Sequence, residues 1–354
     1  MPDNSTTPPV SPQLRSLAGP LSRSRSLNFA LFVAALLWYL CAQAIAASAA
    51  LVLDLRFDLG AARPLIEAAL LLVLPVCGLA LLRAIERRRA PLRLTLGLPR
   101  RATSREEWAT GAAIGWGLAI ASVLPMALAR ALNVHLWTAP RAFQLLALDL
   151  LTLGTATLAH ALAIYGYGFQ RLIEATGPVR ATVILMLLTA LHAALTPTAY
   201  GTPDATRILV ALLAALLLSL CWLRTHGLWL LWGLHFAWAA GIAVLFGLPL
   251  GGDNSFGSIV DTRAAGPAWL TGGEYGPQAA LLSMFILVAA IPVLVRATDE
   301  YAWKYTHPPL IPGGYDVTLA PPAAHIAMEQ AGESAQAASL VQILPSTPQS
   351  PPSE

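Results

Sequence analysis

The chain has 354 residues, of which 56% are hydrophobic and only 12% are charged, and its formal net charge is +3. A soluble domain carries about 25% charged residues, so this composition excludes an ordinary soluble protein and predicts a polytopic membrane protein. Lys304 is the only lysine, and the arginines flank apolar runs, which argues against a nucleic-acid partner. Three cysteines inside apolar runs form no disulfide framework.

Residues 1–26 are rich in Ser, Pro and Arg and have no apolar periodicity, so they are predicted to be a disordered cytoplasmic tail. The apolar run 27–53 follows directly. It is too long for a signal peptide, whose apolar region has about 7–15 residues, and is interpreted as a first membrane span.

Seven further apolar runs predict more membrane-spanning helices. They cover residues 65–85, 109–132, 142–168, 179–195, 208–222, 227–246 and 279–295. The predicted fold class is therefore all-α, a transmembrane helix bundle of about eight spans that occupies residues 27–296. Residues 297–354 are rich in Pro and Ala and are predicted to be a disordered cytoplasmic tail.

The segment 247–278 is too polar to span a membrane. Its glycines, prolines and acidic residues are compatible both with an ordered cap and with a flexible loop, and composition does not decide between them.

The placement of basic residues predicts the orientation. With eight spans and a cytoplasmic N-terminus, sixteen of the 22 basic residues are cytoplasmic, and the outer ones are Arg56, Arg63, Arg130, Arg141, Arg207 and Arg263. This distribution follows the positive-inside rule. It predicts a multi-pass protein of the inner (cytoplasmic) membrane with both termini in the cytoplasm.

Three histidines lie inside the apolar runs: His160, His192 and His235. At 1.5 Å per helical residue, all three are expected near the middle of a bilayer core about 30 Å thick. Ionisable residues at that depth are costly and indicate a functional site. We expect the three to line one polar cavity among the runs 142–168, 179–195 and 227–246, open towards the cytoplasm.

A simpler interpretation is that each histidine only forms a hydrogen bond between neighbouring helices. Asp149 lies three helical turns before His160, too far to touch it. It is a possible partner for a bound water or for His135, or a bridge to a neighbouring span.

The motifs around these histidines resemble the CPBP family of intramembrane proteases, also called type II CAAX prenyl endopeptidase-like or bacteriocin-processing proteins. Family motifs of the form Glu-Glu-x-x-x-Arg, Phe-x-x-x-His and His-x-x-x-Asn correspond to stretches beginning at His160, Leu188 and His235. The stretch Gly168–Leu172 also resembles the family's exit from the first motif. The resemblance covers roughly residues 27–296 and implies a CAAX-type endopeptidase fold of a bacterial membrane.

The departures from the family pattern concern the catalytic groups. The paired glutamates that would activate water are His160 and Ala161, the arginine is Tyr165, and the asparagine is Ala239, so only His192 and His235 are retained. Loss of an oxyanion donor costs about a hundredfold in rate or more, and loss of a general base about 10²–10⁴-fold. In the cavity, Tyr165 is expected at the inner rim, with Ala161 and Ala239 leaving space.

The leading interpretation is an inactive or impaired relative without cofactor, whose partners are membrane lipid and a transmembrane or lipidated peptide. A second interpretation is an active protease with His160 as base, including a zinc site of His160, His192 and His235. A third is a transporter or membrane scaffold.

Overall fold

The computed structural model describes residues 25–85, 91–195, 204–256 and 259–301, together with the single positions 328 and 331. The predicted tails lie almost wholly outside these residues. Where they overlap them the prediction of disorder is wrong, because Arg25 and Ser26 belong to the first helix and Ala297 belongs to the last one. The chain divides into the units Met1–Tyr305 and Thr306–Glu354, and all elements described below belong to the first unit.

An α-helix is found at each of the eight predicted runs, so the all-α bundle is confirmed as the architecture. In chain order, the long helices are α2 (Arg25–Phe57), α3 (Arg63–Ile85), α5 (Ser104–Leu128), α6 (Pro140–His160), α8 (Pro178–Leu195), α9 (Asp204–Thr225), α10 (Trp229–Ala240) and α12 (Leu281–Ala297). Short helical elements are η1 (Gly60–Ala62), α4 (Leu92–Thr95), α11 (Ala268–Thr271), η4 (Gly273–Tyr275) and η5 (Pro277–Ala279).

The chain stays helical well past the predicted end of the run 142–168. α6 passes into the π-helical segment η2 (Ala161–Gly168) and then into α7 (Phe169–Thr176), so the helical stretch has 37 residues. Pro140 begins it, in the first helical turn where a missing N–H costs nothing. Gly177, with φ +88°, ends it in a conformation that favours glycine. α10 likewise continues into a π segment, η3 (Gly241–Leu245).

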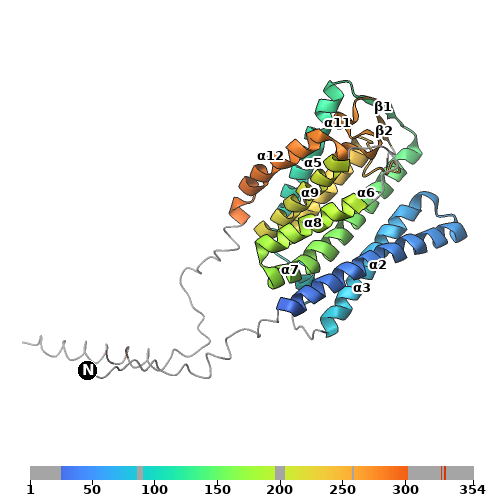
Figure 1. Ribbon diagram of the computed structural model, residues 1–354. Helices are drawn as coiled ribbons and strands as arrows, with labels where there is room; N and C mark the ends of the chain where they lie inside the picture. Colours follow the sequence, from blue (N-terminus) through green and yellow to red (C-terminus); the bar gives the residue numbers. More distant parts are fainter. Residues whose placement is uncertain are drawn as a thin grey trace, which may run out of the picture. The chain divides into compact units, whose positions relative to one another are not determined.

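α10 lies at the centre of the bundle. It packs most extensively against α5 and also contacts α6 and α9, while α2 and α3 form a hairpin that leans on α6, η2 and α7 (Figure 1). Leu230, Leu231, Leu234 and Ala237 of α10 are all buried, as expected for a helix that is apolar all round.

The crossing of α5 and α10 depends on glycine. A Cβ at Gly111 would overlap the carbonyl oxygen of Leu230, and one at Gly115 would overlap that of Leu234. From the other helix, a Cβ at Gly233 would meet the Trp108 carbonyl oxygen. Small residues at these positions let two helix backbones approach closely, which is how helices associate where no hydrophobic effect drives them together.

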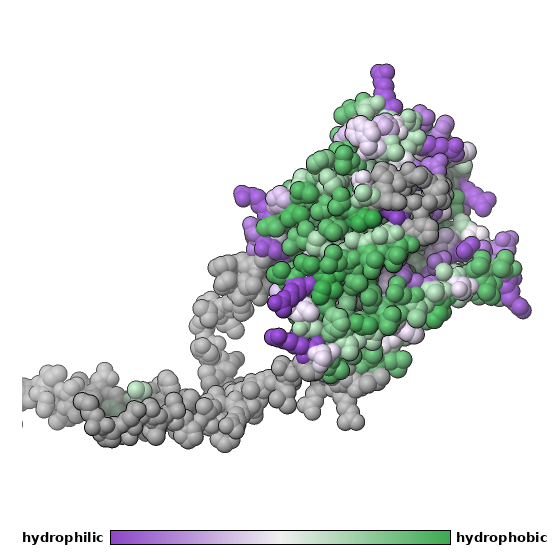
Figure 2. Space-filling model, in the orientation of Figure 1, coloured by the Kyte–Doolittle hydropathy of each residue, from purple (hydrophilic) through white to green (hydrophobic). Residues whose placement is uncertain are grey.

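The surface of the helices is apolar. In the described residues, six helices are long and apolar enough to cross a membrane, and Trp229–Leu245 and Leu281–Ala297 are apolar but shorter. Large apolar side chains such as Leu81, Leu151 and Leu187 are more than half exposed. Figure 2 shows apolar residues gathered over the helices on one face, with hydrophilic residues at both ends of the bundle.

The polar segment after α10 is an ordered cap in its described part. Its strand β2 (Val260–Ala264) pairs antiparallel with β1 (Leu132–Leu136), which connects α5 to α6. Backbone bonds from Thr262 N to Gly247 O (2.9 Å) and from Gly252 N to Tyr275 O (3.0 Å) fold the segment back on itself. The predicted helix end at residue 132 is therefore wrong: the helix stops at Leu128, and Leu132 begins a strand.

Candidate functional site: a histidine-lined chamber

His160 stands at the point where α6 changes from α to π geometry. Its ring contacts three aromatic side chains, with centroid separations of 5.4 Å to His235, 5.9 Å to Tyr165 and 6.1 Å to Tyr39. The hydroxyl of Tyr39 lies 3.4 Å from Nδ1 of His160, and Gln43 Nε2 donates to the same hydroxyl at 3.4 Å. π segments inside α-helices occur frequently at functional sites.

His235 faces His160 from α10. The two rings meet edge to face at an interplanar angle of 77°. Nδ1 of His235 is buried and has no hydrogen-bond partner among the residues that the structure describes. An unpartnered buried imidazole nitrogen is a polar group available to a ligand or a water.

A cavity of about 260 Å³ opens beside the histidine pair, and we call it the chamber. Its wall comes from α2, α3, α6, α10 and the cap, and none of it comes from α8. The lining residues are Tyr39, Leu71, Leu153, Ala156, Thr157, His160, His235, Trp238, Ala239, Leu250 and Gln278. None of them is Asp, Glu, Lys or Arg, so the chamber is mostly apolar with a few uncharged polar groups.

The chamber reaches towards the cap and not towards the opposite end of the bundle. Leu250 and Gln278 of the cap are in its wall. The opposite side is filled by the aromatic column, which we define as Tyr165, Phe169, Trp222 and His226, with successive centroids 6.0, 5.5 and 5.5 Å apart. The expected opening towards the cytoplasm stays a prediction, because it depends on which end of the bundle faces the cytoplasm.

The positions that depart from the family pattern are divided between the wall and the core. Ala239 lines the chamber, as expected from its small size. Ala161 is fully buried and Tyr165 nearly so, and neither lines the chamber. Tyr165 belongs to the aromatic column, on the side of the chamber away from the cap, so its expected position at the rim is wrong.

The structure brings together two of the three expected histidines. His192 is exposed, one turn from the end of α8, and does not line the chamber, although it is near enough to His160 to interact with it electrostatically. Within the described ranges, no group of three or more His, Cys, Asp or Glu side chains is placed to hold a metal ion.

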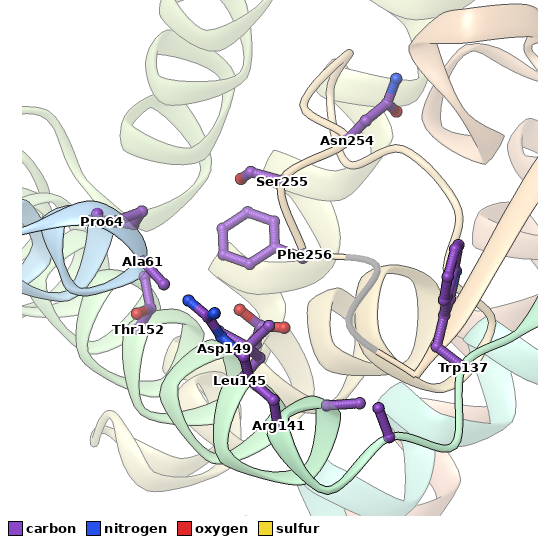
Figure 3. Close-up of a pocket in the computed structure, with 13 residues that line it drawn as sticks. Ala61, Pro64, Trp137, Arg141, Leu145, Asp149, Thr152, Asn254, Ser255 and Phe256 are labelled. Carbon is purple, nitrogen blue, oxygen red and sulfur yellow. The ribbon is translucent and has the colours of Figure 1, made fainter.

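Asp149 belongs to a second cavity, of about 500 Å³, at the cap end of α6, and we call it the outer cavity. Figure 3 shows Arg141 and Asp149 pointing from α6 towards the loop that carries Ser255 and Phe256, with Pro64 of α3 on the other side. His135 is not among the residues that line this cavity, and in the sheet register it lies opposite Asp261.

The two cavities follow one another along the same face of α6. Leu145, Asp149 and Thr152 line the outer cavity, and Ala156 and His160 line the chamber, at the three- and four-residue spacing of a helix face. Asp149 and His160 are eleven residues apart, or about 16 Å along the helix. The outer cavity thus lies on the cap side of the histidine pair, in the direction in which the chamber extends.

Three wall residues were missed by the sequence motifs. Tyr39, Trp238 and Gln278 come from elements far apart in the chain. Trp238 is buried, and its Nε1 has no hydrogen-bond partner within the described ranges. Only Trp238 had a local signal, because it lies one helical turn after His235.

The comparisons with known proteins identify no relative. No protein-family model, no curated protein and no solved structure matches the chain.

Proposed function

We propose that this protein is a membrane-embedded, CPBP-like relative without protease activity, which binds the apolar part of a lipidated peptide or transmembrane segment in the chamber. The observation that carries the proposal is the wall of the chamber itself. It combines the histidines at two motif positions, His160 and His235, with a mostly apolar lining and no carboxylate.

The apolar surface supports the membrane part of the proposal. Six helices have sufficient length and hydropathy to cross a bilayer, and the two shorter apolar helices have 17 residues each, at the lower limit for a span. All eight would then span the inner membrane, with both termini in the cytoplasm and the cap outside.

The chemistry of the wall supports the absence of proteolysis. Hydrolysis of a peptide bond needs a general base for the water and a donor for the oxyanion. His160 is the one group at the motif position of a base, and it is already in contact with Tyr39 and His235. Ala239 offers no donor where the family has an asparagine.

The dimensions favour a chain-like ligand. The chamber and the outer cavity have volumes of about 260 and 500 Å³ and lie in sequence along α6. Leu71, Leu153 and Trp238 offer apolar contact in the chamber, whereas Arg141 and Asp149 offer charge in the outer cavity. An apolar chain with a polar end would match this order.

The test uses the full chain in lipid nanodiscs and a fluorescent peptide that ends in a farnesylated cysteine. Wild type is expected to bind the peptide, as measured by fluorescence anisotropy, and to leave it intact, as measured by mass spectrometry. Ala239→Trp should fill the chamber and weaken binding about tenfold or more, which is about 1.4 kcal/mol.

Leu151→Trp is the matched control, because Leu151 is on α6 but 58% exposed on the outer surface. Its affinity should equal that of wild type. Cleavage by wild type that His235→Ala abolishes would overturn the inactive assignment, and absence of binding by wild type would overturn the binding role.

A further inference from the structure

A third cavity, of about 970 Å³, lies at the end of the bundle opposite the cap, and we call it the Arg/Trp pocket. It is formed by the segment before α5, the first turns of α5 and the start of α10. The lining residues are Arg100, Arg101, Ala102, Ser104, Arg105, Trp108, Trp229 and Trp232. Three guanidinium groups and three indoles with no acid among them make this pocket cationic and aromatic.

The base of the Arg/Trp pocket is held rigidly. Arg101 donates from one guanidinium nitrogen to Thr225 O at 2.6 Å, and Trp229 Nε1 donates to Pro99 O at 2.9 Å. Leu228 N bonds to Gly97 O at 2.9 Å. These bonds join the segment before α5 to the turn before α10, so the pocket is preformed.

One acidic side chain beside the pocket, Glu107, is already paired with Arg101. The Glu107 side chain is fully buried, lies 3.7 Å from the Arg101 guanidinium and accepts a hydrogen bond from Thr103 Oγ1 at 3.0 Å. Arg100 and Arg105 are exposed and have no acid beside them in the lining. They are therefore the charges that the pocket presents to a ligand.

The indoles offer both an apolar wall and one hydrogen-bond donor. Trp232 packs against Trp108 and Trp229, with centroids 6.0 and 6.1 Å apart. Trp232 Nε1 donates to Gly154 O at 3.1 Å, whereas Trp108 Nε1 is buried without a hydrogen-bond partner in the described part of the chain. A buried N–H in that state is expected to have an acceptor in the working protein.

We propose that the Arg/Trp pocket binds the phosphate of an anionic phospholipid, with Arg100 and Arg105 on the phosphate oxygens. Trp108 Nε1 donates to a phosphate or ester oxygen, and the indole faces contact the glycerol region and the first methylenes. Arginine clusters suit phosphate because of their paired donors, and tryptophan is enriched where a membrane meets water. Basic pockets of this kind at the cytoplasmic side bind anionic head groups.

The source of the phosphate is a lipid and not a soluble ion, because three indoles give the pocket an apolar wall that inorganic phosphate does not need. The site is separate from the chamber and does not depend on what the chamber binds. Failure of peptide binding in the chamber would leave this proposal unaffected.

The test is native mass spectrometry of the full chain in detergent, with dioleoyl phosphatidylglycerol and dioleoyl phosphatidylcholine as probes. Wild type should retain phosphatidylglycerol in preference to phosphatidylcholine. One arginine near an anionic lipid surface contributes about fivefold in affinity, so Arg100→Gln with Arg105→Gln should weaken phosphatidylglycerol binding about 25-fold.

Trp108→Phe is the second variant, because it keeps an aromatic ring and removes the donor. It should weaken binding about two- to tenfold, as expected for one hydrogen bond. The control is Arg56→Gln with Arg263→Gln, the same change of charge at the cap end, which should leave binding unchanged.

The proposal is overturned if the cap-end control loses as much affinity as the pocket variant, or if both pocket variants bind like wild type. A large excess of inorganic phosphate should leave the lipid bound. Complete displacement by phosphate would show a soluble anion site and contradict the lipid assignment. If the double arginine variant does not fold, Trp108→Phe decides alone.

Discussion

The hydroxyl of Tyr39 lies 3.4 Å from Nδ1 of His160, and it joins the α2–α3 hairpin to the residue where α6 turns into a π helix. Tyr39 is 6% exposed and lines the chamber, so this contact holds one wall of the chamber in place.

Replacing Tyr39 by Phe is expected to lower the free energy of unfolding by about 0.5–1.5 kcal/mol, the net value of one hydrogen bond. The measurement is denaturation in mixed micelles for Tyr39→Phe, His160→Leu and the double variant. A coupling energy near zero in this cycle would show that the two side chains do not interact.

The glycine contacts between α5 and α10 make a second prediction. Gly233→Ala places a methyl group against the Trp108 carbonyl oxygen, so it should destabilise the bundle by about 1–3 kcal/mol through overpacking. Gly117→Ala is the matched control, because a Cβ there meets nothing within 4 Å. It should be neutral or slightly stabilising, since alanine favours a helix over glycine by about 1 kcal/mol. Equal melting temperatures for the two variants would contradict the close crossing.

Arg171 is 1% exposed and is one of the largest fully buried side chains described. It donates to Glu174 Oε2 at 2.7 Å and to Asn28 Oδ1 at 3.3 Å, and its guanidinium lies 4.9 Å from the centroid of the Tyr167 ring. Arg171→Met keeps much of the volume but removes a hydrogen bond from the buried Asn28. We expect a loss of about 1–3 kcal/mol in the free energy of unfolding.

Glu174→Gln separates that effect from the ion pair. The Glu174 side chain is 42% exposed, so removing its charge should cost less than about 1 kcal/mol. If both variants lose equal stability in the same micelle assay, the ion pair and not the buried amide contact is what Arg171 contributes.

Because of His226, in the turn between α9 and α10, we expect the stability of the protein to depend on pH. Burial, and next the nearby charge of Arg101, lower the pKa of His226 below its ordinary value of 6.5. The folded protein therefore binds this proton less tightly than the unfolded chain does. Stability should be fully present above about pH 6.5 and should fall as the pH drops through the lowered pKa.

The comparison is with His226→Asn, because His226 has φ +47° and asparagine tolerates that conformation. The melting temperature of wild type should fall more between about pH 8 and pH 5 than that of the variant. A wild-type protein with the same pH profile as His226→Asn would show that this histidine does not titrate differently on folding.

The proposed orientation is tested by cysteine labelling in cells, in a variant that lacks Cys41, Cys77 and Cys221. Arg263→Cys is in the cap, where the native side chain is 78% exposed, and it should react with a membrane-impermeant maleimide on intact cells. Ala102→Cys is exposed at the opposite end and should react only after permeabilisation. Labelling of both on intact cells would contradict the proposed topology.

The sequence predicts the eight helices well, because a long apolar run leaves the backbone no partner but itself. It also predicts that His160 and His235 lie close together, because the rise per residue along each helix places both side chains at a similar depth in the membrane. His192 shows the limit of that argument: depth says nothing about the direction in which a side chain points, and this one is exposed on α8.

The remaining features depend on contacts between distant parts of the chain. Tyr39 and Gln278 reach the chamber from either side of the motif region, and no local pattern marks them. Leu132–Leu136 alternates apolar and polar residues, as a strand does, but the β1–β2 pair was missed because its partner Val260–Ala264 lies more than 100 residues later in the chain. In contrast, Gly111 and Gly115 form a Gly-x-x-x-Gly pattern that does predict a close helix crossing.

The pairing of β1 with β2 sets an order of events during synthesis. Leu136 and Val260 are partners in the register, yet about 120 residues separate them. At a synthesis rate of about 5–20 residues per second, β2 is made roughly 6–25 s after β1, and the edge of β1 stays unpaired during that time. All the helices from α6 to α10 are made in that interval. An interrupted or truncated chain would therefore expose an unpaired strand edge, which other chains can join.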